Sequence, residues 1–539
     1  MNIEKLHALA DDLFGKKLSL LSLWQEIADN FYPERADFTV TRPLGQDFAA
    51  QLMSSYPIQC RRDLGNQFST MLRPTAKTWA HIRPKENTPE NNQVKSYLQW
   101  FEETQRRAMY DRSAMFTRAT KEGDHDFAAF GQCAISVELN KNANGLLYRC
   151  WHLRDMAWQE NEEGNIGFVV RKWKPTALVL KRTFKNIHQK VTDMVDKSPF
   201  DTVQCMHFIV DADMYDVKAN GRPRWSIWYD IDNKHIMSAT PIWGKYYVIP
   251  RWQTVSNSQY SYSPATVAAL PDARLLQSMT FTLLEAGEKA TSPPIIATQN
   301  AVRSDVALYA GGITWVDQDY DERLGEALRP LNQDFRGFNY GIEMNRDTRA
   351  MLHTAFFLNK LTMPERAPEM TAYEVGQRVQ EYIRNALPLF EPMEMEYNGS
   401  LCEETFDLLL RHNAFGPVHQ WPRELQGAEV EFSFESPLHD AIEQQKGQKF
   451  QEFNQLIAQA VALDQTMANV PKAEVALRDA LNGIGVPAKW LNDEATVKER
   501  IDAQRAQQQQ QQMLASLEQA SNAAKNFGQS GMAQPAAAM

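Results

Sequence analysis

The chain has 539 residues, of which 43% are hydrophobic, 10% aromatic and 23% charged, and its 57 basic and 67 acidic residues leave a formal net charge of −10. This length excludes a single small domain, and the apolar content excludes a wholly disordered chain. The acidic balance excludes a protein that coats DNA, because neutralising phosphates along a surface requires a basic excess, although an acidic chain can still enclose DNA without gripping it.

The cysteines and the N-terminal segment bear on the compartment. Five cysteines occur, none in a C-x-x-C pair, which favours reduced thiols and folding in the cytoplasm over a disulfide framework. The segment MNIEKLHALADD is acidic where a signal peptide requires an apolar run, and no stretch approaches the roughly 18 apolar residues of a membrane span. We therefore expect a protein that is neither secreted by this route nor membrane-spanning.

Helical periodicity dominates the first part of the chain. Apolar residues at three- and four-residue intervals predict an amphipathic helix over the first thirty residues, with its stripe packed in a core. A second helix is predicted from about Asn92 to Lys121. The arginines of its polar face, which we interpret as solvated, are Arg106, Arg107, Arg112 and Arg118.

The middle of the chain changes to a strand pattern. From Phe127 to about Pro250, short β-rich runs separated by turns such as Asn-Gly and Glu-Gly predict an antiparallel sheet. We interpret the tryptophans between Trp151 and Trp252 as packing residues of this sheet rather than as a ligand cage.

Helices return after this sheet. A helix is predicted over about 271–290, stopped by the pair Pro293-Pro294, and a second over about 341–359. Residues 295–336 contain PIIAT, a Gly-Gly turn and ITWV, which together indicate a small α/β insertion between these helices.

A third helix is predicted to start at Thr371, with Glu374 at the capping-box position, after the break LNKLTMPERAPEM. The strand EVEFSFE and an almost wholly helical C-terminal region follow. The chain ends in a run of glutamines and an Ala/Gly/Ser segment that lack the apolar content of a core, so the last thirty or so residues are predicted to be mobile.

Motifs for catalysis and cofactor binding are missing. The sequence contains no G-x-x-x-x-G-K-[ST], H-E-x-x-H, G-x-S-x-G or G-x-G-x-x-G and no Cys/His group with zinc spacing. The acidic run from Asp317 to Glu322 superficially matches a calcium loop, but it lacks the glycine at the sixth place and the glutamate at the twelfth. We interpret it as a solvated acidic loop or one that faces a basic partner, and expect no metal, no cofactor and no catalytic residues.

Four separated motifs follow one another in a characteristic order, namely FAAFGQCAISVEL, YSYSPATVAALPDARLLQSMTFTLLEAGEKATSPPII, PEMTAYEVGQRVQEYI and EVEFSFESPLHDAI. In this order the chain resembles the head-to-tail connector, or portal, proteins of short-tailed bacteriophages, over about residues 1–450. The family commonly has a basic residue in the Tyr-x-x-x-Pro segment, where this chain has Ser261 and Ser263, and a larger polar residue at the position of Gly376.

The resemblance implies a mixed α+β portal fold with a β-rich wing, paired stem helices, a small α/β clip and a helical crown, assembled as a ring. The implied boundaries are 1–255 for the wing, 256–290 for the first stem helix, 291–336 for the clip, 337–358 for the second stem helix, 359–370 for a tunnel loop, 371–435 for a long helix and the remainder of the wing, 436–506 for the crown and 507–539 for the mobile tail.

The function implied by the resemblance is structural rather than enzymatic. A ring, normally of twelve copies in this family, would sit at one vertex of the virion capsid after assembly in the host cytoplasm, and double-stranded DNA would pass through it during packaging and ejection. The implied partners are the packaging ATPase (terminase large subunit), the major capsid and scaffolding proteins, the tail adaptor and the internal core proteins, with no membrane. A ring of copies that each carry −10 repels phosphate overall, as a conduit must.

The resemblance also assigns site residues. The clip residues expected to bind the packaging ATPase and the tail are Asp317, Asp319, Asp321 and Glu322. The tunnel loop holds two basic residues, Lys360 and Arg366, and repetition of Arg366 around a ring would form a circle of positive charge that touches DNA phosphates. From the residues alone, a surface turn with solvated charges is the favoured interpretation of this loop, and the family resemblance reverses that preference.

Two other functions stay open on the sequence. A virion enzyme such as a depolymerase or peptidase is one, because a pair of catalytic carboxylates leaves no motif. A scaffold or adaptor that is not a portal is the other, although it would not explain a long helix, an insertion and a second helix in this order.

Overall fold

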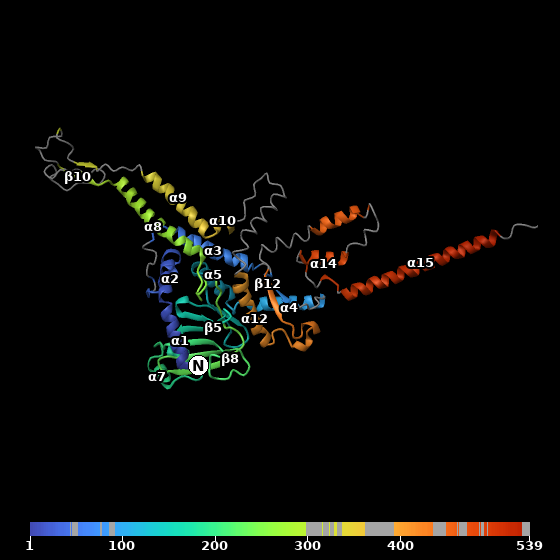
Figure 1. Cartoon of the computed structure of the whole chain (residues 1–539), viewed down its shortest axis with the longest axis horizontal. Helices are drawn as coiled ribbons and strands as arrows, with labels where there is room; N and C mark the ends of the chain where they lie inside the picture. The colour runs from blue at the N-terminus through green and yellow to red at the C-terminus, as the bar shows by residue number, and fades with distance from the viewer. Residues whose placement is uncertain are drawn as a thin grey trace, which may run out of the picture. The chain divides into compact units, whose positions relative to one another are not determined.

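In the computed structural model of the chain, the described residues are 1–43, 45, 52–75, 78–85, 92–297, 315, 323, 328–330, 337–361, 393–434, 449–460, 462, 472–483, 486, 490–492 and 494–530. They form two compact units. The first comprises Met1–Trp79 and Arg107–Leu408, and the second comprises Ala80–Arg106 and Leu409–Met539. The mixed α+β class predicted from the sequence is confirmed (Figure 1).

The first unit combines helices with antiparallel sheets. Its helices are α1 Ile3–Lys16, α2 Leu18–Phe31, α3 Tyr56–Leu72, α5 Phe116–Phe130, α6 Ala177–Thr183, α7 Gln189–Lys197, α8 Pro264–Thr291, α9 Gly337–Ala355, α10 Leu358–Leu361 and, after a π-helix at Glu394–Gly399, α12 Ser400–Arg411. Its strands are β2 Ile135–Leu139, β3 Leu146–Cys150, β4 Met156–Glu160, β5 Ile166–Trp173, β6 Cys205–Asp211, β7 Arg224–Asp230, β8 His235–Ile242, β9 Tyr247–Val248, β10 Ile295–Ala297 and β11 Leu328–Pro330.

A five-stranded antiparallel sheet in the order β4-β5-β6-β7-β8 forms the main β structure, and β3-β2-β9 form a second sheet. Side chains alternate between the two faces of a strand, so every second residue of β5, β6 and β7 points to α1. Leu6, Leu13 and Phe14 of α1 are buried against this face, and Figure 1 shows α1 lying across the strands. The antiparallel sheet predicted in this region is confirmed.

The second unit pairs two segments that are distant in the sequence. β1 Ala80–Pro84 is antiparallel to β12 Val430–Phe434, which confirms the strand predicted from EVEFSFE. Its helices are α4 Asn92–Met109, α14 Ala473–Gly483 and α15 Glu494–Ser530. Phe101 of α4 packs on the rings of Phe415 and Trp421 at 4.9 and 4.8 Å between centroids.

The prediction of one N-terminal helix was wrong, because the helix breaks at Lys17. α1 contacts β4, whereas α2 contacts α3, α5 and α8, so the two halves of the apolar stripe face different cores. The Lys17 side chain is buried at the break, where its ammonium group donates to the carbonyls of Leu153 and Met156 at 2.5 Å each. A single straight helix could not serve both cores.

The helix predicted over Asn92 to Lys121 is likewise two helices. α4 ends at Met109 and α5 begins at Phe116, after Met115 adopts a left-handed conformation with φ 58°. The Asp111 carboxylate accepts from the backbone N–H of Ser113 at 2.8 Å, and this turn competes with helix continuation. Arg118 is exposed, as predicted for the polar face.

Three further boundaries differ from the predicted ones. α5 extends to Phe130, so the first strand begins later than Phe127, and α6 and α7 interrupt the β-rich region. α8 begins at Pro264 rather than near Pro271, because Ser263 caps it and Pro264 occupies a first-turn position. α9 spans Gly337–Ala355 and ends before Phe357, whose φ of 57° departs from the helix.

Several predicted features lie outside the described residues, among them the helix from Thr371, the Gly-Gly turn at 311–312 and most of the tunnel loop. α15 continues into the predicted tail as far as Ser530, and its described side chains from Ile501 to Leu517 are exposed. No disulfide joins the five cysteines, all of which are described. Among the described residues, no helix is both long and apolar enough to cross a bilayer.

Candidate functional site: the α8–α9 hairpin

The first turn of α8 is anchored on the carboxyl end of α5. The Ser263 hydroxyl accepts from the N–H of Thr266 at 3.4 Å and donates to the carbonyl of Ala128 at 2.8 Å. The Thr266 hydroxyl donates to the carbonyl of Ala129 at 2.7 Å. Free carbonyls at the end of one helix are thereby satisfied by the start of the other. The direction of α8 is therefore fixed by hydrogen bonds as well as by packing.

Gly131 permits this close approach. It has a φ of +74°, and a Cβ on it would fall on the backbone of Tyr262. The Ser261 hydroxyl donates to the Gly131 carbonyl at 2.6 Å, and Ser261 and Ser263 are both buried. Thus the FAAFG and YSYSP segments, distant in the sequence, form one joint. The two serines that depart from the family pattern serve as hydrogen-bonding residues inside it.

Beyond the joint, α8 and α9 form an antiparallel pair (Figure 1). The Asn345 side-chain amide donates to the Thr280 hydroxyl at 3.1 Å. A Cβ at Gly341 would meet the Leu283 side chain at 2.9 Å, so glycine lets the helices approach there. At the end of the hairpin that is next to the joint, Arg274 Nε donates to the Glu26 carboxylate of α2 at 2.7 Å. At the far end, β10 and β11 pair.

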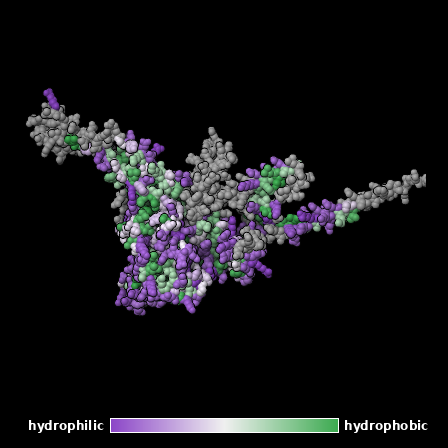
Figure 2. All heavy atoms as spheres, in the orientation of Figure 1, coloured by the Kyte–Doolittle hydropathy of each residue, from purple (hydrophilic) through white to green (hydrophobic). Residues whose placement is uncertain are grey.

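Large apolar side chains of the hairpin remain exposed outside this contact. On α8 they include Phe281 and Leu284, each 53% exposed, besides Val267 and Leu275. On α9 they include Tyr340, Met344 and Met351, with exposures of 71%, 40% and 58%, besides Ile342. Hydrophobic residues along the helices are visible in Figure 2. Exposed apolar side chains of this size that gather on one helical hairpin favour an interaction site.

The two rows lie on opposite sides of the hairpin. The inner row of α8 contains Thr280 and Leu283, which contact α9, and the inner row of α9 contains its buried residues Asn345, Thr348 and Leu352. At 3.6 residues per turn, Phe281 and Leu284 are rotated on average about 100° from the inner row of α8 in one sense. The side chains of Tyr340, Met344 and Met351 are rotated about 90° from the inner row of α9 in the other sense. In an antiparallel pair, opposite senses fall on opposite sides. We call Phe281 with Leu284 the α8 flank, and Tyr340 with Met344 and Met351 the α9 flank.

Most of the site residues predicted from the sequence lie outside the part of the chain that the structure describes. Asp317, Asp319, Asp321, Glu322 and Arg366 lie outside the described residues. Lys360 is described: it lies in α10, is exposed, and its ammonium group is 5.8 Å from the Phe357 ring. The structure therefore brings none of these residues together in the described part. The flanks were not predicted as a site, although their three- and four-residue spacing is readable once the helices are known.

A buried polar chain on the five-stranded sheet bears on the enzyme alternative. His207 contacts the Ser226 hydroxyl through Nε2 at 2.9 Å and the Tyr247 hydroxyl through Nδ1 at 2.6 Å. Arg171 Nε donates to Tyr247 at 2.9 Å. Burial lowers the pKa of His207 well below its ordinary value and raises that of Tyr247 to about 12. A Ser-His pair normally suggests a nucleophile and its base.

This network is closed to substrates. Both Ser226 and His207 are buried, and the His207 ring stacks on Trp228 at 3.8 Å. The nearby cavity of about 120 Å³ is lined by Tyr247 but by neither Ser226 nor His207. We assign the network to the stability of the sheet. Among the described residues, no group of three His, Cys, Asp or Glu side chains is placed to hold a metal ion.

Comparison with known proteins identifies the family. The family model described as "Bacteriophage head to tail connecting protein" matches residues 4–491, which is most of the chain. The chain belongs to this family. The resemblance stated from the sequence motifs is thereby confirmed, and this connector is a component of a tailed phage particle.

Individual relatives agree with this assignment. The connector is 23% identical over 442 residues to a protein named "Probable portal protein" of Bordetella phage BPP-1, covering 78% of this chain and 77% of the relative. It is 19% identical over 453 residues to the "Portal protein" of Salmonella phage epsilon15, covering 81% and 79% of the two chains. These names are those of structural components.

A solved structure titled "Virion of native gene transfer agent (GTA) particle" also matches the connector. The match has a TM-score of 0.35 and 10% identity, and covers 81% of this chain and 95% of the other.

Proposed function

We propose that this connector is a portal, a homo-oligomeric ring at one capsid vertex through which double-stranded DNA enters and leaves. The observation that carries the proposal is the pair of exposed apolar rows on opposite sides of the α8–α9 hairpin. If the α8 flank of one copy covers the α9 flank of the next, each copy has one neighbour on either side. Such a head-to-tail contact closes into a ring when its rotation divides a full turn.

The charge of the connector suits passage rather than capture. Each copy carries −10, so a ring of many copies repels the phosphates of a duplex overall. Scattered basic residues can still centre the DNA. We further propose that the ring has twelve copies; membership of the family of head-to-tail connecting proteins supports both this number and the position at a vertex.

Two variants test the head-to-tail contact. Phe281→Ser with Leu284→Ser removes the α8 flank, and Met344→Ser with Met351→Ser removes the α9 flank. Each variant alone should be monomeric in light scattering, and rings should disappear from negative-stain images. An equal mixture should form dimers only, because one intact α8 flank still meets one intact α9 flank. Phe200→Ser, at a site 77% exposed outside the hairpin, is the control and should leave rings intact.

A parent chain that stays monomeric across salt and concentration would refute the ring. Rings formed normally by both flank variants would refute the assignment of the flanks. If the mixture regains complete rings, the contact is not head-to-tail.

For the clip, we propose that the acidic residues 317–322 bind the packaging ATPase and, later, the tail adaptor. Supporting this is their place in the sequence between the segments that form β10 and β11 at the far end of the hairpin. Exchange of Asp317, Asp319 and Asp321 for Asn should weaken binding of at least one of these partners while rings still form. Unchanged binding of both partners would remove the assignment.

For the channel, we propose that Arg366, together with Lys360, contacts DNA phosphates. The support is that Lys360 is exposed directly beyond the second hairpin helix. Arg366→Ala should leave assembly unchanged but lower DNA packaging or retention, most at low salt, where phosphate contacts are strongest. Full packaging and retention at every salt concentration would show that Arg366 is not the gate.

A further inference from the structure

One end of the five-stranded sheet carries two regions of opposite charge, which we call the acidic edge (Glu162 and Glu163, between β4 and β5) and the basic edge (Lys218 and Arg222, between β6 and β7). The order β4-β5-β6-β7-β8 places β4 at one edge and β8 at the other. In one row across the sheet, Glu160 pairs with Ile166, and Arg224 pairs with both Asp211 and Ile242. The β4–β5 turn, the β6–β7 loop and the end of β8 therefore leave the sheet at the same end. The β4–β5 turn and the β6–β7 loop are centred two strand spacings apart in this order, which is roughly 10 Å.

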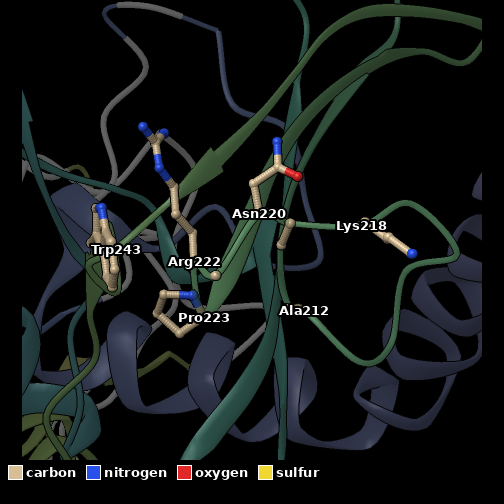
Figure 3. Close-up of a pocket in the computed structure, with 8 residues that line it drawn as sticks. Ala212, Lys218, Asn220, Arg222, Pro223 and Trp243 are labelled. Carbon is tan, nitrogen blue, oxygen red and sulfur yellow. The ribbon is translucent and has the colours of Figure 1, made fainter.

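A pocket of about 620 Å³ lies on the β8 side of this end (Figure 3). Its lining includes Ala212, Lys218, Asn220, Arg222, Pro223 and Trp243. Asn220 and Gly221 have φ values of 49° and 81°, and Arg222 N–H donates to the Ala219 carbonyl at 3.1 Å. Two positive φ values closed by this hydrogen bond are the geometry of a type I′ turn, here within the loop between β6 and β7. The pocket wall is therefore preformed.

The pocket combines an exposed indole with two cations. Trp243 is 44% exposed, so the prediction that the tryptophans of this region are packing residues is wrong for Trp243, whereas Trp158, Trp225 and Trp252 are buried as predicted. Among the described residues, neither Lys218 nor Arg222 forms an ion pair with a carboxylate. Arg222 instead donates to the Pro241 carbonyl. The neighbouring acids Asp211 and Asp216 are already paired, with Arg224 at 3.0 Å and the amine of Met1 at 2.6 Å.

The β4 side presents the opposite charge on an equally ordered turn. Glu162 and Glu163 are exposed between β4 and β5, and neither forms an ion pair with a described cation. The Asn161 side-chain oxygen accepts from the N–H groups of Glu163 and Asn165 at 3.1 and 3.0 Å. Gly164, with φ 78°, completes the turn. Two carboxylates thus project from a turn whose backbone is held in place.

We propose that the Glu162-Glu163 turn of one copy docks into the Lys218, Arg222 and Trp243 pocket of the adjacent copy. This inference rests on the proposed ring, in which every copy has a neighbour on either side. Two different and complementary surfaces on one copy can join successive copies head to tail around a ring. The two carboxylates meet Lys218 and Arg222, and the methylene groups of the glutamates pack on the indole.

A second copy fits this pocket better than a nucleic acid does. The pocket is lined largely by alanine, glycine and proline around one tryptophan, whereas single-stranded nucleic acid requires successive aromatic platforms along a basic groove. The acidic turn, in contrast, is supplied by the same chain at the matching position. Charge complementarity across an interface of this kind fixes register and selects the partner.

Charge reversal on the full-length chain tests the contact. The basic-edge variant carries Lys218→Glu with Arg222→Glu, and the acidic-edge variant carries Glu162→Lys with Glu163→Lys. Each alone should require about tenfold more protein for half-assembly into rings, as measured by analytical ultracentrifugation, and added salt should reduce this difference. Combining all four substitutions in one chain should restore assembly. Lys181→Glu with Arg182→Glu, an equal charge change at exposed positions on α6, is the control and should assemble as the parent does.

Mixing the two single-edge variants gives a second readout. The first variant has acidic groups at both sites and the second has basic groups at both sites, so alternating copies should assemble together at concentrations where neither variant assembles alone. Normal rings from either variant by itself would overturn the proposal, and so would failure of both the mixture and the four-substitution chain to recover. Loss of nucleic-acid binding without any change in assembly would overturn it as well. Failure of the parent to form rings would instead refute the proposed function.

Discussion

The body of the first unit and the α8–α9 hairpin treat their side chains in opposite ways. In the body, charged and polar groups are buried and paired: Arg73 and Asp124 form an ion pair with side-chain exposures of 2% and 0%. On the hairpin, apolar side chains such as Phe281 and Tyr340 face outward. The body pairs such charged groups within one chain, whereas the hairpin leaves apolar surface that only another molecule can cover. A single copy is therefore complete in its core and incomplete along its hairpin.

Removal of Arg73 should produce the largest loss of stability. Its guanidinium also donates to Asn398 at 2.8 Å and lies 4.7 Å from the Tyr397 ring, so it joins α3, α5 and the π-helix. Arg73→Met leaves the Asp124 carboxylate buried without its partner, which costs about 3–5 kcal/mol in the free energy of unfolding. Urea unfolding followed by tryptophan fluorescence measures this change.

The pH dependence provides an internal check on the Arg73 prediction. Burial raises the pKa of Asp124, and Arg73 opposes that rise. Without Arg73, protonation of the carboxyl becomes easier, so the loss of stability should shrink as the pH falls. Arg62→Met, on the exposed side of α3, is the control and should change stability by less than about 0.5 kcal/mol. An equally small change in Arg73→Met would contradict the assignment of the buried pair.

Lys17 should make the stability of the body depend on pH, with an effect of intermediate size. Burial lowers the pKa of Lys17 from 10.5 to about 7, Asp155 raises it and Lys172 lowers it. The unfolded chain keeps this proton up to about pH 10.5, so between pH 7 and 10.5 it binds more protons than the folded protein. Stability should therefore rise with pH in this window, by at most about 1.4 kcal/mol per pH unit.

The Lys17 contribution is isolated by difference. In Lys17→Met the rise of stability with pH that is attributed to Lys17 should vanish. Lys16→Met, at an exposed neighbouring position, should keep the parental dependence of stability on pH. Thermal unfolding at several pH values measures both. Identical slopes in the parent and Lys17→Met would show that the buried amine keeps an ordinary pKa.

The joint between α5 and α8 should show a smaller effect. Ser263→Ala removes the cap of α8 and leaves the buried Ala128 carbonyl without the hydroxyl that donates to it. A loss of about 1–2 kcal/mol is expected. Ser278→Ala, at an exposed position on the same helix, should be neutral. If the two variants unfold at the same urea concentration, the cap does not stabilise the joint.

Local sequence patterns predicted the elements but not their interruptions. Apolar spacing predicts helices at α2 and α9 and strands between α5 and α8, because each pattern depends on near neighbours. The break at Lys17 depends on carbonyls at Leu153 and Met156, far along the chain. The start of α8 depends on carbonyls at the end of α5. Such partners leave no local signal.

The candidate site was predictable only in part. The family predicted from the sequence was correct, but the contact of the YSYSP and FAAFG segments through Gly131 and Ser261 appears only in three dimensions. The ion pair of Arg73 and Asp124 joins residues 51 positions apart, with no spacing rule to suggest it. The flanks, in contrast, follow from helical periodicity once the inner face of each helix is known. The sequence alone does not show that α8 and α9 pack on each other, and so it does not show which face is the inner one.

The hairpin flanks should have the smallest effect on the stability of a single copy. Leu284→Ser with Met351→Ser replaces side chains that are 53% and 58% exposed, so most of their apolar surface is already in water, and the free energy of unfolding of the monomer should change by less than about 0.5 kcal/mol. Assembly alters this balance, because a partner that binds only the folded state stabilises it by mass action. The parent should therefore unfold at higher temperature as its concentration rises, whereas the variant should unfold at one temperature throughout. Differential scanning fluorimetry over a hundredfold concentration range measures the difference. If the variant is destabilised by more than about 2 kcal/mol at the lowest concentration, these side chains support the fold of the single copy, and the contrast between a complete body and an incomplete hairpin fails.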